Sequence, residues 1–277
     1  MNSFDSPPRL TTSPRRQIGV LSAVTAVLLA AFFVVPGSLS HQGVDTGNLS
    51  ATFRSGMVGY WESGSQDFPR QLEATVAFWF RFHLVKAGVS ALLLAATVAL
   101  GVALWRQWRR PAVDRPGRVL LAPPALLATL LGPFALVALV ANVQGATAPF
   151  ASLLPLLTNG GADGELTTTL AQIRQQLADH PAGPHTPALT AMVNDLALYH
   201  AVLAAMAALV TVALAAIAIA QWRQHRTTPD ARSRRALKLG ITMSVLLSGV
   251  VLVVAFANTT TATHSPEALA GLFNGGW

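Results

Sequence analysis

The chain of 277 residues is strongly apolar: 52% of its residues are hydrophobic and 11% are charged. A soluble domain usually carries about 25% charged residues, so this composition excludes an ordinary soluble globular protein. The net charge of +7 could suggest a nucleic-acid partner, but the basic residues flank apolar stretches, so we expect no nucleic-acid binding. The absence of cysteine excludes disulfides, thiolate metal sites and cysteine nucleophiles.

Five long apolar stretches predict an all-α integral membrane protein. A helix needs about 20 apolar residues to cross a bilayer core, and only helices or closed barrels satisfy their backbone groups there. The stretches lack the alternation of apolar and polar residues that barrel strands show. The predicted transmembrane helices cover residues 18–38, 76–105, 119–142, 197–222 and 239–258.

The basic residues predict the orientation of these helices. Fourteen of the nineteen Lys and Arg residues lie in alternate connecting segments. Because Lys and Arg in short loops stay inside the cell, we expect a cytoplasmic N-terminus and an extracytoplasmic C-terminus. The composition, rich in Ala, Arg and Leu, is typical of a bacterial genome of high GC content, so we expect a bacterial plasma-membrane protein. The lipid bilayer, including its anionic lipids, is the first predicted partner. The predicted cytoplasmic segments are 1–17, 106–118 and 223–238, and the predicted outer segments are 39–75, 143–196 and 259–277. The fourteen residues are Arg9, Arg15, Arg16, Arg106, Arg109, Arg110, Arg115, Arg118, Arg223, Arg226, Arg232, Arg234, Arg235 and Lys238.

The first helix could be a signal anchor or a cleaved signal peptide. Ser38-Leu39-Ser40 offers a small-x-small cleavage site, but the apolar run Ile18–Val35 exceeds the ~7–15-residue core of a signal peptide. We therefore expect a retained helix.

The second outer segment predicts local structure. Leu166, Leu170, Ile173 and Leu177 follow the spacing of one apolar helix face, and the pattern ends at His180-Pro181. Such a short amphipathic helix would lie on the membrane surface or on the outer ends of the bundle. A further helix is expected to begin at Pro187 and to run into the fourth span.

Comparison of the chain with itself predicts an internal repeat. A constant shift aligns Phe82-His83 with Tyr199-His200, and Trp105-Arg106-Gln107 with Trp222-Arg223-Gln224. A one-residue adjustment then aligns Asn142 with Asn258. The predicted fold is therefore one leading helix plus two repeated out–in–out helical hairpins, related by an axis along the membrane normal.

The paired histidines are the candidate cofactor-binding residues. His83 and His200 are predicted at similar depth near the outer ends of equivalent helices, and neutral imidazoles can hold a haem, a metal ion or a quinol head group. Asp195 and Tyr199 could orient His200 from behind. The alternative interpretation is that both histidines only place a polar edge in the headgroup layer.

Four further polar residues complete the candidate set. Arg81 and Lys86 flank His83 and could attract an anionic ligand, or could extend to the interface as amphipathic side chains often do. Asn142 and Asn258 could hydrogen-bond across the repeat axis, or could end their helices as residues that tolerate the left-handed conformation. Both Trp-Arg-Gln segments are expected to anchor helix ends at the cytoplasmic interface.

The sequence predicts no catalytic residue. The five apolar stretches are Ile18–Val35, Leu84–Trp105, Val119–Ala141, Ala201–Ala220 and Leu239–Ala257. No charged residue lies in the middle third of any of them, where an ion relay would need one. We therefore expect a non-catalytic membrane subunit, scaffold or envelope-associated factor that meets a protein partner through an apolar patch on its outer loops. One alternative is a redox or oxygenase-type protein with haem or metal held by His83 and His200. The other is a facilitator for a neutral or lipid-like solute, with a bend at Gly132-Pro133 lining its path.

Overall fold

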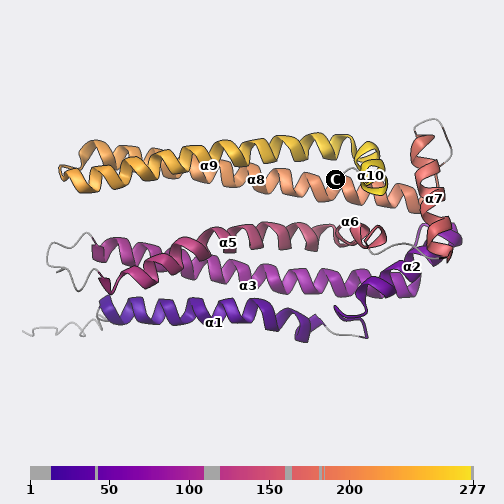
Figure 1. Ribbon diagram of the computed structural model, residues 1–277, viewed down its shortest axis with the longest axis horizontal. Helices are drawn as coiled ribbons and strands as arrows, with labels where there is room; N and C mark the ends of the chain where they lie inside the picture. The colour runs from indigo at the N-terminus through magenta and orange to yellow at the C-terminus, as the bar shows by residue number, and fades with distance from the viewer. Residues whose placement is uncertain are drawn as a thin grey trace, which may run out of the picture. The chain divides into compact units, whose positions relative to one another are not determined.

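The computed structural model describes residues 14–40, 43–108, 119–159, 164–180, 183 and 185–275. These residues form helices and short connections, and none of them lies in a β-strand. Five helices are long and apolar enough to cross a bilayer, which confirms the prediction of a helical multi-pass membrane protein. They are α1 (Pro14–Ser40), α3 (Arg70–Trp108), α5 (Ala122–Thr147), α8 (Pro187–Thr227) and α9 (Ala231–Thr263), shown in Figure 1. Of the predicted cytoplasmic arginines, Arg9, Arg109, Arg110, Arg115 and Arg118 lie outside the described residues.

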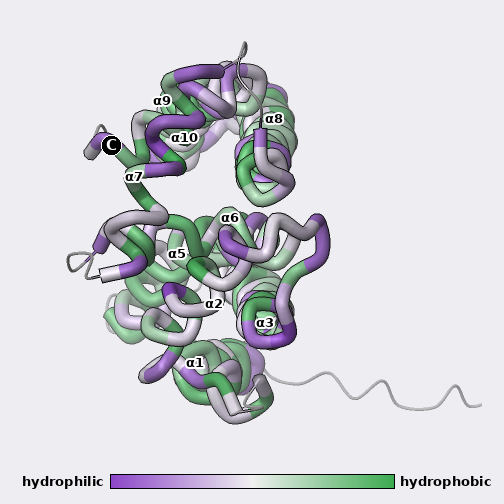
Figure 2. Tube along the Cα trace, turned by 90° about the vertical axis from the view of Figure 1, so that its right-hand side faces the viewer, coloured by the Kyte–Doolittle hydropathy of each residue, from purple (hydrophilic) through white to green (hydrophobic). Residues whose placement is uncertain are grey.

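The long helices present large apolar side chains on their surfaces. Phe256 of α9 is 74% exposed and Val34 of α1 is 70% exposed. Exposure of that size is costly in water but not in hydrocarbon, so these surfaces are compatible with contact to lipid tails. Figure 2 shows hydrophobic turns along α1, α5 and α8.

The chain divides into two compact units. The first comprises Met1–Pro36 and Val85–Leu139, and the second comprises Gly37–Leu84 and Val140–Trp277. Helices α3 and α5 each contribute to both units, whereas α8 and α9 belong wholly to the second.

The first unit is held together by a small apolar core. Ile18 of α1 is buried with Leu100 and Leu104 of α3. Farther along α1, the ring of Phe32 meets the ring of Phe134 in α5 edge-to-face, with centroids 5.4 Å apart. Pro133 lies within α5, which continues on both sides of it.

The second unit carries a group of short helices with a hydrophobic core of its own. We call these helices, together with the first turns of α3 and α8, the cap. Phe53, Met57 and Tyr60 are fully buried in this core. The segments predicted as outer loops are therefore largely folded. The short helices are α2 (Leu49–Ser63), α6 (Pro149–Leu153), the 3₁₀ helix η1 (Leu154–Leu157), α7 (Gly164–Ala178) and α10 (Ser265–Phe273).

Helix α7 covers the segment in which the sequence predicts a short amphipathic helix, and its apolar residues are buried. It packs against α2 and α10 of the cap. The indole Nε1 of Trp61 donates to Gln172 Oε1 of α7 over 2.6 Å, and Arg174 Nε donates to the carbonyl of Phe273 over 2.9 Å. The apolar stripe is thus covered by protein.

Side-chain caps start both helices of the α8–α9 hairpin. Thr186 accepts a hydrogen bond from the Leu189 N–H, and α8 begins at Pro187 as predicted. Asp230 accepts from the Ser233 N–H over 2.7 Å at the start of α9. This bond lowers the pKa of the Asp230 carboxyl below its usual range, with smaller contributions from the Ser233 side chain and from Arg232.

Helices α3 and α8 are much longer than a bilayer is thick. At 39 and 41 residues they extend about 58 and 62 Å, against a hydrocarbon core of about 30 Å. Their first turns belong to the cap core, through Phe78 on α3 and Met192 on α8. His83 and His200 each lie thirteen residues after the first residue of their helix, where the cap gives way to the apolar span.

Candidate histidine–asparagine sites

The first site joins α3 to α5 within the second unit. His83 Nδ1 lies 2.8 Å from Asn142 Oδ1. Asn142 is buried, with 6% of its surface exposed, and His83 is half-buried. The Trp79 ring meets the imidazole edge-to-face at 4.6 Å, and its Nε1 donates to Ser152 Oγ over 2.7 Å. The imidazole is therefore held on one side by the carboxamide and on another by an indole that is itself fixed.

A glycine makes room for this imidazole. A Cβ atom added at Gly145 would lie 2.8 Å from Cγ, Cδ2 and Cε1 of His83, a separation that real Cβ atoms essentially never show. Helix α5 thus brings its backbone against the face of the ring because residue 145 has no side chain. Neither Gly145 nor Trp79 carries a local sequence signal for this role, since a glycine in a span is usually attributed to helix packing.

The second site joins α8 to α9 and repeats the same bond. His200 Nδ1 lies 2.7 Å from Asn258 Oδ1. His200 is buried, with 6% exposure, and Asn258 is half-buried. The Asn258 Nδ2 donates to the carbonyl of Val254 over 2.9 Å, which fixes the orientation of the amide and directs Oδ1 at the ring.

These bonds set the tautomer of both imidazoles. A carboxamide oxygen only accepts, so Nδ1 of each neutral ring carries the proton and Nε2 carries the lone pair. Nε2 is buried in both histidines. Proteins orient metal-binding histidines in this way, through a hydrogen bond from the ring nitrogen that faces away from the metal.

Neither asparagine ends its helix, in contrast to one interpretation of the sequence. A hydrogen bond across the two hairpins stays a prediction. Asn142 and Asn258 each lie five residues before the last residue of α5 and α9. Among the described residues only glycines have positive φ. Each asparagine bonds to the histidine of its own hairpin because it lies one turn inside the helix, on the face toward the neighbouring helix.

Asp195 and Tyr199 connect the end of α5 and the start of α6 to α8. Asp195 Oδ2 accepts from the Ala151 N–H over 2.7 Å, and the Tyr199 carbonyl accepts from Gln144 Nε2 over 3.1 Å. These hydrogen bonds run to backbone and amide groups and not to His200. The Tyr199 ring lies edge-to-face with the His200 ring, with centroids 5.5 Å apart.

The two basic candidates have different surroundings. Arg81 is half-buried and belongs to the second unit with His83, and its Nε is buried. Lys86 belongs to the first unit, where its Nζ lies 4.4 Å above the centre of the Phe32 ring. Attraction of an anion to His83 by this pair stays a prediction.

Two grooves in the first unit flank α3 near its C-terminal end. One has a volume of about 350 Å³ and runs between α1 and α3, and the other, of about 260 Å³, runs between α3 and α5. Pro133 lines neither of them, so the solute path predicted at this residue stays a prediction.

Comparisons with known proteins do not extend this description. No protein-family model, no curated protein and no solved structure matches the chain. The case for a function therefore rests on the residues described above.

Proposed function

We propose that the protein is a non-catalytic subunit or scaffold of the bacterial plasma membrane, which meets an envelope partner through its cap. The observation that carries this proposal is the cap core, which unites residues from Val44 to Phe273. A surface that is already folded loses little conformational entropy when a partner binds. The orientation proposed, with the N-terminus in the cytoplasm, follows from the Lys and Arg distribution and puts the cap outside the cell.

The cap surface supports a polar interface. The large hydrophobic side chains that are exposed lie on the long helices or just before α5, and none belongs to the described residues of α2, α6, η1, α7 or α10. The apolar patch expected on the outer loops is thus missing from these helices, because their apolar residues fill the cap core. Partner contact would then rest on hydrogen bonds and charge, as in many transient interfaces.

In-cell photocrosslinking tests this proposal. A photoreactive residue is placed at exposed cap positions 62, 165 and 175, and at position 253 on the lipid-facing surface of α9 as the control. We expect at least one cap position to give a discrete adduct that a charge-reversing substitution beside it abolishes. Equal background labelling at all four positions would reject a partner-binding cap.

The internal repeat is part of the same proposal. The α3–α5 and α8–α9 hairpins each carry a histidine thirteen residues from the helix start and an asparagine five residues from the helix end. The two His–Asn bonds, at 2.8 and 2.7 Å, support a duplicated out–in–out hairpin.

A histidine-bound haem or metal ion is the second candidate, and the shared tautomer favours it. Both imidazoles donate from Nδ1 and so turn the lone pair of Nε2 away from the asparagine. A neutral Nε2 is the form that ligates haem iron and transition metals. This candidate makes the protein a redox or oxygenase-type membrane protein.

Absorption spectra of the detergent-purified protein, oxidised and reduced, test the second candidate. Protein made with added haem is compared with a His83→Ala/His200→Ala variant and with a His180→Ala/His264→Ala variant as a matched control. A Soret band that only the first variant loses supports bis-histidine haem. A featureless spectrum, together with no stoichiometric metal by elemental analysis, would reject both versions.

A further inference from the structure

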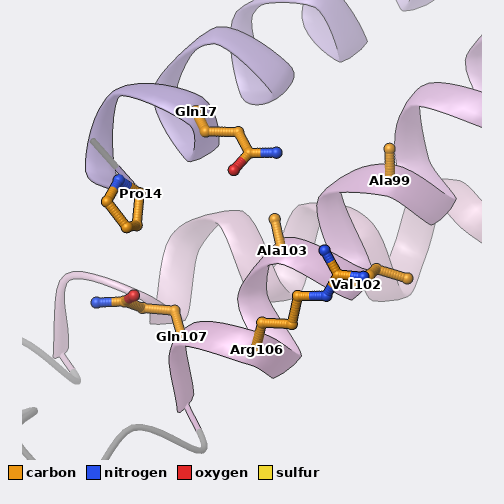
Figure 3. Close-up of a pocket in the computed structure, with 7 residues that line it drawn as sticks. All are labelled: Pro14, Gln17, Ala99, Val102, Ala103, Arg106 and Gln107. Atoms are coloured by element: carbon orange, nitrogen blue, oxygen red, sulfur yellow. The ribbon is translucent and has the colours of Figure 1, made fainter. Parts of the chain in front are cut away.

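We propose that the groove between α1 and α3 binds an anionic phospholipid with a phosphoglycerol headgroup. Figure 3 shows that Pro14 and Gln17 come from α1 and that the other five lining residues come from α3. All seven belong to the first unit. The volume, about 350 Å³, is within the range of small-molecule sites, roughly 300–1,000 Å³.

The α3 wall of the groove is amphiphilic along its length. Residues 99, 102, 103, 106 and 107 follow the i, i+3, i+4, i+7, i+8 spacing of one helix face. Ala99, Val102 and Ala103 form the part nearer the middle of the span, and Arg106 and Gln107 form the part at the helix end. A lipid shows the same change from apolar to polar along its length, with its acyl chain toward the bilayer centre and its headgroup at the surface.

Charge at the mouth selects an anion. Arg106 lines the groove. Arg15 and Arg16 lie in the first turn of α1, between the lining residues Pro14 and Gln17. The positive end of the α1 dipole adds about half a charge, and the negative end of the α3 dipole subtracts about as much. Because the two dipole contributions cancel, the full positive charge of Arg106 makes the net charge at the mouth of the groove positive. None of the lining residues is acidic.

A buried oxygen at the mouth favours a headgroup that can donate hydrogen bonds. Gln107 Oε1 is buried and has no hydrogen-bond partner among the described residues. A buried acceptor without a donor costs about 1–3 kcal/mol, and the hydroxyls of a glycerol headgroup supply such donors. The choline headgroup has no hydrogen-bond donor and its cation offsets the phosphate charge, so Arg106 and Gln107 together favour phosphatidylglycerol over phosphatidylcholine.

The groove lies at the level of an interfacial anchor. The rings of Trp105 and Trp108 stack with centroids 5.3 Å apart in the same turns of α3. Tryptophan favours the headgroup region, so the mouth of the groove lies where lipid phosphates lie. Basic pockets between helices at this level are recognised lipid sites.

Native mass spectrometry of the full-length protein in detergent, with equal amounts of phosphatidylglycerol and phosphatidylcholine of matched chains, tests the proposal. We expect one phosphatidylglycerol to bind about fivefold more tightly than phosphatidylcholine. Arg106→Ala should remove this preference. Arg223→Ala, in the corresponding Trp-Arg-Gln segment of α8, should preserve it. Soluble glycerol phosphate should not compete, because it lacks the chain that the apolar wall holds.

A groove-filling variant separates the site from general surface charge. Ala99 is exposed, so Ala99→Phe should fold normally while it blocks the apolar wall and keeps every charge. We expect it to reduce phosphatidylglycerol binding as much as Arg106→Ala does. Full binding by Ala99→Phe, an equal loss with Arg223→Ala, or no lipid preference in the unmodified protein would each overturn the proposal.

Discussion

The two His–Asn sites make the same bond and bury opposite partners. In the α3–α5 hairpin the asparagine is the buried member and the histidine is half-buried, whereas in the α8–α9 hairpin the histidine is buried and the asparagine is half-buried. Three residues after the asparagine, the first hairpin has Gly145 and the second has Thr261. The two hairpins thus share the His–Asn hydrogen bond, and the packing around this bond decides whether the histidine or the asparagine is the buried partner.

The largest difference in stability between the hairpins should come from substitution of the residue three positions after each asparagine, which is Gly145 in one hairpin and Thr261 in the other. Gly145→Ala puts a methyl group 2.8 Å from three ring atoms of His83, and overpacking of this kind costs about 2–3 kcal/mol. This cost exceeds the ~1 kcal/mol by which alanine stabilises a helix relative to glycine, so we expect a net loss of stability. Thr261→Ala is the matched control, and its unfolding free energy in detergent should change by less than about 1 kcal/mol. Equal stability of the two variants would mean that the ring does not rest on α5.

Removing each asparagine should rank the two bonds. Asn142→Ala leaves the Nδ1–H of His83 without its acceptor and opens a buried space, so we expect a loss of about 2 kcal/mol. Asn258→Ala, at the more exposed position, should cost about 1 kcal/mol because water can replace the amide. Chemical denaturation in micelles measures both. A larger loss for Asn258→Ala than for Asn142→Ala would contradict the conclusion that Asn142 is the more buried of the two asparagines.

The position equivalent to Asp195 in the first hairpin is Phe78, so one hairpin meets the cap through a carboxylate and the other through a ring. Asp195→Asn keeps an acceptor for the Ala151 N–H but removes its charge, and should cost about 1 kcal/mol. Hydrogen exchange at the Ala151 N–H measures how far the substitution weakens this hydrogen bond. Unchanged protection in the Asp195→Ala variant would show that another group bonds this N–H.

The smallest effect should appear at the turn of the α8–α9 hairpin. The pKa of Asp230 is lower in the folded protein than in the unfolded chain. Its stabilising contribution is therefore complete above the unfolded pKa of about 4 and is lost as the pH falls through the folded pKa. We expect the hydrogen-exchange protection of the first turn of α9, taken relative to the intrinsic exchange rate at each pH, to fall below pH 4 in the native protein. The same turn in Asp230→Ala, which lacks the titrating cap, should show no such step.

The sequence predicts the five long helices and much of the amphipathic α7 because hydropathy and helix spacing are local properties. It also names His83, His200, Asn142 and Asn258, but it does not pair them. Pairing depends on how α3 and α5, and α8 and α9, rotate against each other, which no local pattern contains. One interpretation of the sequence places the asparagines at helix ends because the apolar run stops there, yet both helices continue into threonine-containing turns.

The cap differs most from its prediction, and the reason is again non-local. Aromatic residues between two membrane spans commonly lie at the membrane interface, because single rings favour it. In the structure Phe53 and Tyr60 lie edge-to-face with Phe150, almost a hundred residues later in the chain. An interfacial aromatic and a core aromatic have the same local signature, and only the fold distinguishes them.

The position of α10 has a consequence for biosynthesis. Leu269, Leu272 and Phe273 complete a core that otherwise comes from residues 44–196, and Arg174 holds the carbonyl of Phe273. Ribosomes deliver these residues only after α9 has been inserted. The cap core therefore stays incomplete until α10 has been translated.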